Sequence, residues 1–354
     1  METKRLDIGS SLQDYIDNGI GLSDLEAVRL ILAGNSVVDW NRANFRSLKE
    51  VDNFFKLHLI DLEESTDIRR ISYLHSAAIT YLEEHLGLRF PADLKEPKDV
   101  RELFLIASYV GGFRRKQILS CVILKLMHVL YHLEAAELRY QISLAESTLL
   151  EAAERRILRA GKQLLDSDLD VVSFYGSRKA RNSVITKLLA KKENIAATVF
   201  DKLRFRIVTS SKEGVLPAIA WLQQNLFPFN YVIPGQSHNN LMHFLEMLKR
   251  KGTTELSSNG IVEDVEQSWM QNSFSSSNYK NINFIVDFPV RIDHLTERPH
   301  QSILGKVVFV MVEFQIVDQE TALANESGDS AHHLYKSRQL DQVKRRLRKG
   351  GKRQ

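Results

Sequence analysis

The run Lys306-Val-Val-Phe-Val-Met-Val-Glu-Phe-Gln-Ile-Val317 is a nearly continuous stretch of apolar, strand-forming residues. Such a run predicts a central strand that is buried on both faces of a sheet. It contains Glu313 and Gln315, which the two-residue period of a strand places on the same side, towards the strand's end. A carboxylate in these surroundings is costly unless it is paired, hydrogen-bonded or bound to a metal. Glu313 is therefore a candidate functional residue, with an ion pair to a neighbouring Arg or Lys as the structural alternative.

The second half of the chain, from about residue 166, alternates predicted strands with predicted helices. Further strands are expected at 171–175, 203–209 and 282–292, and helices at 182–192 and 215–225. The stretch 252–277 is rich in Ser, Asn, Gly and Thr, which is typical of a mobile connection. These patterns predict a mixed α/β unit with few strands.

The first 150 residues have the apolar spacing of helices. Apolar residues recur at intervals of three and four, and the segment 115–141 predicts a long central packing helix. His128 and His132 stand four apart on it, a spacing that two metal ligands can share. Their neighbours are Leu, Met, Val and Tyr, and no third ligand is suitably spaced, so we interpret both as histidines at the edge of the core.

Length and composition indicate a folded protein with more than one packing unit. The chain has 354 residues, more than the roughly 250–300 at which a single core stops growing. Apolar residues make up 44% and charged residues 26%, close to globular averages. We expect a helical N-terminal domain over 1–160, a second domain over 161–343 and a basic tail over 344–354.

The net charge of +4 arises in the predicted tail. Seven of the 48 basic residues lie between 344 and 353 with no acid among them, so the remainder has 41 basic against 44 acidic residues, or −3. A broad nucleic-acid-binding face on the folded part is therefore not indicated. RNA is a candidate partner of the tail alone, and a solvated terminus is the simpler interpretation.

Membrane insertion and secretion are not expected. The apolar run 307–312 is far shorter than the ~20 residues of a bilayer span, and residues 1–10 have no apolar signal-peptide core. We therefore expect a cytoplasmic protein without a membrane partner. The single cysteine, Cys121, excludes a disulfide framework and Cys-based zinc sites, and its apolar surroundings predict a small buried side chain.

A basic segment, Tyr175-Gly-Ser-Arg-Lys-Ala-Arg-Asn-Ser-Val-Ile-Thr-Lys187, predicts a glycine turn that leaves a strand and enters a helix. Lys179, Ser183 and Lys187 follow one another at i, i+4 steps along about 12 Å of one helix face. Such a row beside a helix N-terminus suits a polyphosphate, and a solvated basic face is the alternative. Asp201 opens the strand 203–209, and two acids on separate strands, Asp201 and Glu313, can together hold Mg²⁺ against phosphate oxygens.

Taken in order, these segments resemble a known family. The basic strand and helix at 175–187, the Asp201…Arg206 strand, the tyrosine of Ser277-Asn-Tyr-Lys-Asn-Ile-Asn283, the Glu-Phe-Gln-Ile strand end and the segment 326–336 closely resemble the synthetase domain of the RelA/SpoT alarmone (ppGpp) synthetases. The last two are the most specific, the final one through Gly328, Ala331, His332, Tyr335 and Lys336. The resemblance covers about 165–345 and implies an α+β, nucleotidyltransferase-like synthetase domain with a mixed sheet, preceded by an all-α domain.

The resemblance also implies roles for individual residues. Glu313 would share Mg²⁺ with Asp201 in one cleft or act as general base on the acceptor's 3′-hydroxyl. Tyr279 would stack on the guanine of GDP or GTP with its ring face open to the cleft. The remaining roles fall on Lys179, Ser183 and Lys187 at the ATP phosphates, Arg206 at the adenine, and Gln315 and His332 in support of the site and the acceptor.

Several positions depart from the family pattern. Where the family has a basic residue directly after the loop glycine, this chain has Ser177, and the basic residue Arg178 follows one position later. Where the family has a glycine in the next strand, this chain has Arg204. The family's Arg-Thr after Gln315-Ile316 is Val317-Asp318, and two acceptor-side positions are Asn278 and Asn283. No His is followed by Asp, so the family's metal-dependent hydrolase half is not apparent.

Three functions stay open at this point. The first is a Mg²⁺-dependent GTP pyrophosphokinase, a transferase of the stringent response that moves pyrophosphate from ATP to the 3′-hydroxyl of GDP or GTP. The second is a pyrophosphokinase that acts on the tRNA 3′ end. The third is a catalytically degenerate nucleotide-binding or regulatory protein. All three predict ATP as a ligand, and the first adds a guanine nucleotide.

Overall fold

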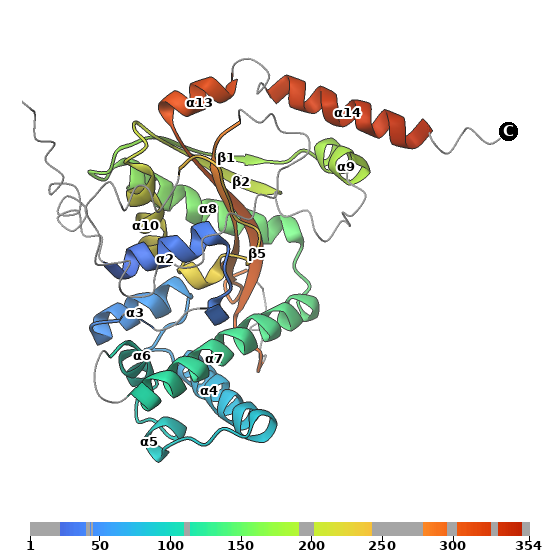
Figure 1. The fold of residues 1–354 in the computed structure, drawn as a ribbon. Helices are drawn as coiled ribbons and strands as arrows, with labels where there is room; N and C mark the ends of the chain where they lie inside the picture. The colour runs from blue at the N-terminus through green and yellow to red at the C-terminus, as the bar shows by residue number, and fades with distance from the viewer. Residues whose placement is uncertain are drawn as a thin grey trace, which may run out of the picture.

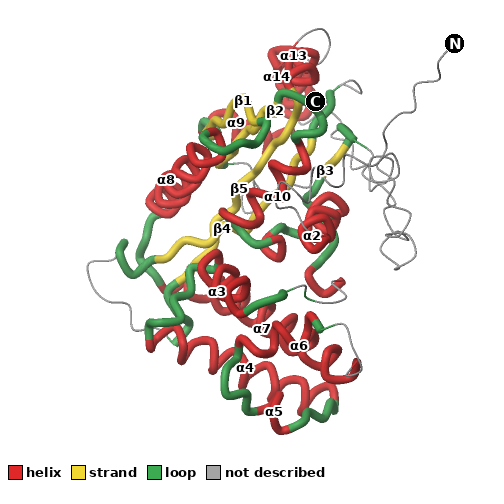
Figure 2. Tube along the Cα trace, turned by 90° about the vertical axis from the view of Figure 1, so that its left-hand side faces the viewer, coloured by secondary structure: helices red, strands yellow, loops and turns green. Residues whose placement is uncertain are grey.

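The computed structural model describes residues 22–39, 43, 45–109, 114–190, 202–242, 279–295, 303–326 and 332–348. Its first part contains α2 (Leu22–Ala33), η1 (Val37–Asp39), α3 (Leu48–Leu57), α4 (Ser65–Leu86), α5 (Ala92–Lys95), α6 (Arg101–Ser108), α7 (Arg114–Gln141) and α8 (Glu146–Leu165). Its second part contains β1 (Val171–Arg178), α9 (Arg181–Ala190), β2 (Leu203–Thr209), α10 (Val215–Asn225), η3 (Phe229–Tyr231), β3 (His238–Asn239), β4 (Ile282–Arg291), β5 (Val307–Asp318), α13 (Gln319–Glu326) and α14 (His332–Arg348). Helices α3 to α7 gather at one end of the strands, and α13 and α14 lie at the other (Figure 1, Figure 2).

The strands form one mixed sheet in the order β1-β2-β5-β4-β3. Strands β2 and β5 are parallel, and the other neighbours are antiparallel. The strand predicted over 306–317 is confirmed as β5, the middle strand, and most of its residues are buried. The prediction of an α+β fold with a mixed sheet is therefore confirmed.

One face of the sheet carries a row of phenylalanine rings, one from each of four neighbouring strands. Phe174, Phe205, Phe314 and Phe284 follow one another with centroid separations of 5.6, 5.9 and 5.8 Å. We call these four residues the aromatic ladder. Helix α8 packs against it at β1, and Phe227, just after α10, packs on the ring of Phe314 at 5.1 Å. The ladder is the part of the core that fixes which face of each strand points away from solvent.

Helix α7 covers the beginning of β5 on the opposite face. Phe309, which shares a side of the strand with Glu313, stacks on His132 at 4.2 Å and meets the ring of Tyr131 edge-on. The imidazole Nδ1 of His132 lies 3.2 Å from Asp287 Oδ2 on β4, and Nδ1 of His128 lies 3.0 Å from the Asn230 amide. Burial lowers the pKa of His128 well below its ordinary value. Both histidines therefore pack where α7 meets the sheet, as the sequence predicted.

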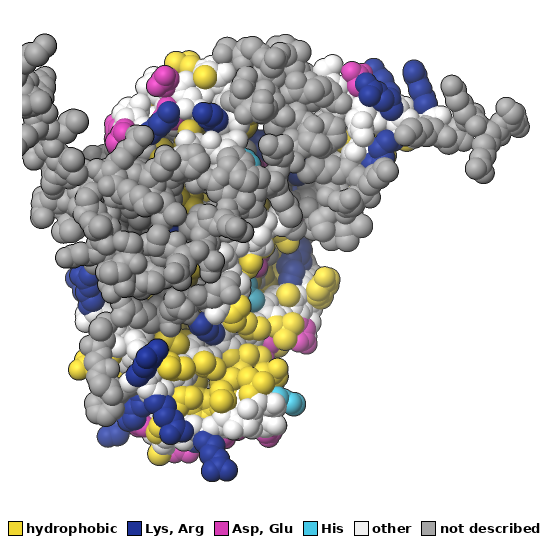
Figure 3. Space-filling model, viewed as in Figure 1, with side chains coloured by type: hydrophobic (Ala, Val, Ile, Leu, Met, Phe, Trp, Pro, Cys, Tyr) yellow, Lys and Arg dark blue, Asp and Glu magenta, His cyan; other side chains and the backbone are white. Residues whose placement is uncertain are grey.

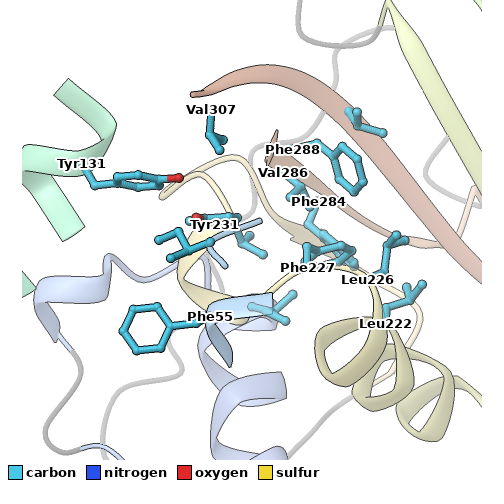
Figure 4. Packing of buried hydrophobic residues seen from close by; sticks show 14 of the residues in the cluster. Phe55, Tyr131, Leu222, Leu226, Phe227, Tyr231, Phe284, Val286, Phe288 and Val307 are labelled. Atoms are coloured by element: carbon cyan, nitrogen blue, oxygen red, sulfur yellow. The ribbon is translucent and has the colours of Figure 1, made fainter. Parts of the chain in front are cut away.

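Helices and sheet share one hydrophobic core. A single cluster of buried side chains extends from Val28 in α2 to Ile316 in β5. Figure 4 shows Tyr131 of α7 and Phe55 of α3 on one side of Tyr231, with Leu222 of α10 and Phe284 and Phe288 of β4 on the other. An all-α N-terminal domain is thus not confirmed, because α8 crosses the predicted 160/161 boundary and packs on β1. The domain limits stay predictions, and α14 includes the first part of the predicted basic tail.

Helix α7 also has an exposed apolar side. Among the described residues, α7 is the one helix that is long and apolar enough to span a membrane, judged by length and composition alone. Its most apolar window of 18 residues has a mean hydropathy of 1.5, and 39% of that window is buried. Figure 3 shows a band of hydrophobic side chains in the lower part of the molecule, and Val129 and Leu133 of α7 are 45% and 64% exposed. Its other side packs against α4, α6 and β5, as in a core helix. The expectation of no membrane partner stays a prediction.

Gly161 allows α8 to approach the aromatic ladder closely. A Cβ at this position would lie 2.3 Å from Cδ1 of the Phe174 ring. Replacing a helical Gly with Ala gains about 1 kcal/mol of helix propensity, whereas forcing a methyl group into a packed contact costs about 1–3 kcal/mol. We therefore expect Gly161→Ala to lower the free energy of unfolding by about 1 kcal/mol, measured by urea denaturation. Lys162→Ala, at an exposed position of the same helix, is the control, and a Gly161→Ala protein as stable as this control would contradict the close approach.

Candidate functional site

Polar side chains occupy the face of the sheet opposite the aromatic ladder. The strand register aligns Tyr175, Arg206, Gln315, Asn283 and His238 in a line across all five strands, with Ser177, Arg204 and Glu313 in the next line. We call these eight residues the polar row. Because side chains alternate along each strand, residues of the ladder and of the row come one after the other in the sequence. The row lies beyond the part of β5 that α7 covers at Phe309.

Glu313 is buried in the polar row and fully hydrogen-bonded. Its side chain is 5% exposed. Nε of Arg204 donates to Oε2 at 2.8 Å, and the amides of Asn283 and Gln315 donate to Oε1 at 3.1 and 2.9 Å. The charge-assisted bond to Arg204 is of the strong kind and compensates the buried carboxylate. The structural alternative proposed for Glu313, an ion pair with a neighbouring Arg, is the arrangement found.

The surroundings of Glu313 do not suit Mg²⁺. This ion prefers oxygen ligands in an octahedron at about 2.0–2.1 Å, whereas the groups around Glu313 are an arginine and two amides that present N–H donors. The described part of the chain contains no group of three or more His, Cys, Asp or Glu residues able to hold a metal. Asp201, the predicted second carboxylate, lies outside the described residues. The expectation that Asp201 and Glu313 share a cleft therefore stays a prediction.

Arg206 lies in the middle of the polar row with donors that are not used. Its Nε and Nη2 are buried and find no hydrogen-bond partner in the described structure. Leaving buried N–H donors without an acceptor costs about 1–3 kcal/mol each, and more for charged groups. Gln315 lies opposite Arg206 in the register. The position therefore offers a fixed positive charge and two donors without a partner to an acceptor such as an anionic oxygen.

The predicted glycine turn at residue 176 is wrong. Strand β1 continues through Gly176 to Arg178, and α9 begins only at Arg181. Gly176 is required by packing, since a Cβ there would lie 2.6 Å from the ring of Phe205 on the next strand. The backbone of Lys179 is held beside the start of β2 by a hydrogen bond from its N–H to the Lys202 carbonyl at 3.0 Å.

The remaining phosphate ligands of the prediction lie on α9. Ser183 and Lys187 are both half-buried there, and α9 packs against α14. Lys179 precedes this helix and is also half-buried. Contact of these three residues with phosphate stays a prediction.

The neighbours Ser177 and Arg178 point to opposite faces of β1. Ser177 lies opposite Arg204 in the polar row. Arg178 points to α8, where its guanidinium pairs with Glu154 at 2.5 Å and with Glu151 at 3.6 Å. A shift of one residue in a strand exchanges the faces. Arg178, which stands one position later than the family's basic residue, is therefore not part of the polar row.

The acceptor side of the predicted site is described in part. Tyr279 is half-buried just before β4, and its carbonyl accepts a hydrogen bond from the Asn240 amide at 2.7 Å. The next residue, Lys280, exchanges hydrogen bonds with Asn325 of α13 at 3.0 and 2.6 Å. These bonds fix the backbone, while stacking of the Tyr279 ring stays a prediction. His332 is the first residue of α14, and its side chain lies outside the described residues.

Five members of the polar row were not among the predicted site residues: Tyr175, Ser177, Arg204, Asn283 and His238. Arg204 and Asn283 were visible only as departures from the family pattern, and the structure shows that both departures contact Glu313. His238 belongs to a two-residue strand that no sequence pattern marks. Burial lowers the pKa of His238 below its ordinary value, so its imidazole is neutral at neutral pH.

Comparisons with known proteins give distant structural matches. No family model matches the chain, and no curated protein matches it. Small alarmone synthetase 1 from Bacillus subtilis is 14% identical, over 62% of this chain and 88% of that one, with a TM-score of 0.31. The structure of that synthetase bound to its product pppGpp gives 14% identity, coverage of 57% and 88%, and a TM-score of 0.34. A GTP pyrophosphokinase family protein from Streptococcus pneumoniae is 9% identical, over 58% and 90%, with a TM-score of 0.30. These values do not establish the family.

Proposed function

We propose that this protein binds a nucleotide on the polar row and does not transfer its pyrophosphate. The observation that carries the proposal is Arg206, whose buried Nε and Nη2 lack a partner in the described structure. A phosphate oxygen is an acceptor that matches a guanidinium in charge and geometry. The resemblance of the sequence motifs to alarmone synthetases supports a nucleotide over other phosphorylated ligands, with ATP and guanine nucleotides as the candidates.

The contacts of Glu313 support binding without transfer. A carboxylate that acts as general base must be free to accept a proton from the attacking hydroxyl. Here Oε2 of Glu313 is held by Arg204, and Oε1 accepts from two amides. Among the three functions that the sequence leaves open, these contacts favour the nucleotide-binding protein. Transfer to GDP, to GTP or to a tRNA end becomes an outcome that the experiment must exclude.

The proposal predicts a specific loss of affinity when Arg206 is changed. We expect Arg206→Met to weaken binding of ATP or GTP about 10- to 100-fold, because hydrogen bonds to charged groups contribute about 1.5–3 kcal/mol. Equilibrium dialysis with radiolabelled nucleotide measures this change. Arg178→Met is the matched control, since Arg178 lies on the neighbouring strand but points to α8.

The same preparation decides between binding and catalysis. Incubation with labelled ATP, Mg²⁺ and either GDP, GTP or tRNA should give neither AMP nor a new labelled product. Formation of either would overturn the absence of transfer. Equal affinity of the wild-type and Arg206→Met proteins for every nucleotide tested would overturn the binding site.

A further inference from the structure

We infer that Arg204 occupies the place of a divalent cation at Glu313, and that removing its side chain creates a cation site formed by Glu313, Gln315 and Asn283. The inference rests on the proposed function and extends it, because it names the residue that makes the site independent of a metal. It starts from the register, in which Arg204 and Glu313 stand directly opposite each other on the parallel strands β2 and β5.

The positions of the two charges indicate that Arg204 approaches from the open side. The Arg204 side chain is 33% exposed, whereas that of Glu313 is 5% exposed. Arg204 is therefore the more exposed partner of the pair, and its Nε donates to Oε2 of Glu313 at 2.8 Å. A cation that enters from solvent meets this positive charge first. Coulomb repulsion at such short range is strong in a partly buried site, so Arg204 and a divalent ion cannot both occupy it.

The other two neighbours of Glu313 can serve as ligands once Arg204 is absent. Asn283 and Gln315 both direct their amides to Oε1. A side-chain amide carries an acceptor oxygen as well as its N–H₂ donors, and rotation of the terminal group exchanges the two. Together with Glu313 they supply three oxygens from one face of the sheet, and Mg²⁺ and Mn²⁺ are bound by such oxygens together with water.

The energetics favour entry of the cation after the substitution. Removing one partner of a buried ion pair leaves an uncompensated charge, which is strongly destabilising. Glu313 lies on the middle strand of the sheet, between β2 and β4. Binding of a cation then restores the compensation that Arg204 supplied. The structure thus assigns Arg204 as the residue that determines whether the site takes a guanidinium or a metal.

The experiment measures Mn²⁺ binding in the absence of nucleotide. The full-length wild-type protein should show no Glu313-dependent Mn²⁺ binding by electron paramagnetic resonance, whereas Arg204→Ala should bind one ion, with an affinity at least tenfold above that of the wild type. Glu313→Gln in the Arg204→Ala background should abolish this binding. Mn²⁺ should also raise the melting temperature of Arg204→Ala but not that of the matched control Arg178→Ala.

Two results would overturn the inference. The first is Glu313-dependent Mn²⁺ binding by the wild-type protein. The second is the absence of a gain in Mn²⁺ affinity in both Arg204→Ala and Arg204→Met. The methionine variant is included because its aliphatic side chain keeps much of the packing of Arg204, so the test does not depend on whether Arg204→Ala folds. Nucleotide affinity of the wild-type protein in the presence of a chelator is measured separately, so failure of the proposed function is distinguishable from failure of this inference.

Discussion

Replacing Arg156 with methionine is expected to lower the free energy of unfolding by about 3 kcal/mol. Arg156 extends from α8 and donates to three carbonyls of distant segments: Leu57 at 3.4 Å, Leu226 at 3.0 Å and Pro289 at 3.2 Å. Its guanidinium also lies 4.9 Å from the centre of the Phe288 ring. Methionine keeps much of the volume but leaves three carbonyls without their charged donor.

The effect is large because Arg156 has no acidic partner among the described residues and relies on these carbonyls. Two of them belong to helix C-termini, where the macrodipole favours a cation: Leu57 ends α3, and Leu226 is the C-cap of α10. Burial lowers the pKa of Arg156 to about 10, so the group stays charged at neutral pH. The arginine therefore joins α3, α8, α10 and β4 at one point.

Urea denaturation with a neighbouring control tests this role. Arg155→Met removes the same charge from an exposed position of α8 and should change stability by less than about 0.5 kcal/mol. A midpoint for Arg156→Met equal to that for Arg155→Met would show that the carbonyl contacts contribute nothing. Arg156→Lys should fall between the wild type and Arg156→Met, because a single ammonium cannot reach three acceptors in the same fork.

The second large effect is expected at Arg291, where β4 ends against α4. Nε of Arg291 donates to Asp293 at 2.8 Å, and Nη1 donates to Asp67 at 2.7 Å and to the Leu59 carbonyl at 3.0 Å. Glu64 pairs with both Arg291 and Lys306. We expect Arg291→Met to lower the free energy of unfolding by about 2 kcal/mol at neutral pH. The loss is smaller than for a fully buried ion pair because the Arg291 side chain is 19% exposed.

The cost of Arg291→Met should depend on pH. The hydrogen bond from Lys306, supported by Thr66 and Arg291, lowers the pKa of Glu64 from 4.5 to about 2. Burial alone would raise the pKa of Asp293, but the hydrogen bond from Arg291 outweighs it and lowers that pKa. Carboxylates with lowered pKa values stabilise the fold above their unfolded-state pKa, and this contribution is lost as the pH falls through the folded-state value.

The difference in stability between wild type and Arg291→Met should therefore shrink as the pH falls from about 4.5 to about 2. Unfolding curves at pH 7, at the upper end of this window and near its lower end measure the change. Arg89→Met, an exposed arginine after α4, serves as the control and should show a small difference that does not vary with pH. A cost for Arg291→Met that stays constant over this range would show that the carboxylates do not contribute through their charge.

The sheet was more predictable from sequence than the contacts of its site. The strands over 203–209, 282–292 and 306–317 were predicted within a residue of β2, β4 and β5, because long apolar runs mark buried strands. Strand β1 was predicted too short because glycine usually signals a turn, whereas Gly176 makes room for the ring of Phe205. The local sequence pattern indicates the periodicity of a strand or helix, but not which side chain of a neighbouring element packs against it.

For the candidate site, the sequence singled out Glu313 but not its partner. The cost of a carboxylate in an apolar strand is a local property, and it flagged Glu313 correctly as a residue that needs compensation. Arg204 lies 109 positions away and reaches Glu313 only because β2 pairs with β5 in parallel. Strand order and register depend on the whole core, so this contact could not be derived from either segment alone.

The alternation between the aromatic ladder and the polar row determines which sequence changes the sheet can accommodate. The ladder supplies the packing that holds β1, β2, β5 and β4 together, while the row contributes side chains that face the other way. A substitution in the row therefore leaves the packing of the ladder in place, although it costs stability where it leaves a buried charge such as that of Glu313 without its partner. An insertion or deletion within a strand would instead exchange the two faces. Exchanging Arg204 for a small residue would thus alter the occupant of the site while the aromatic ladder on the other face keeps its packing.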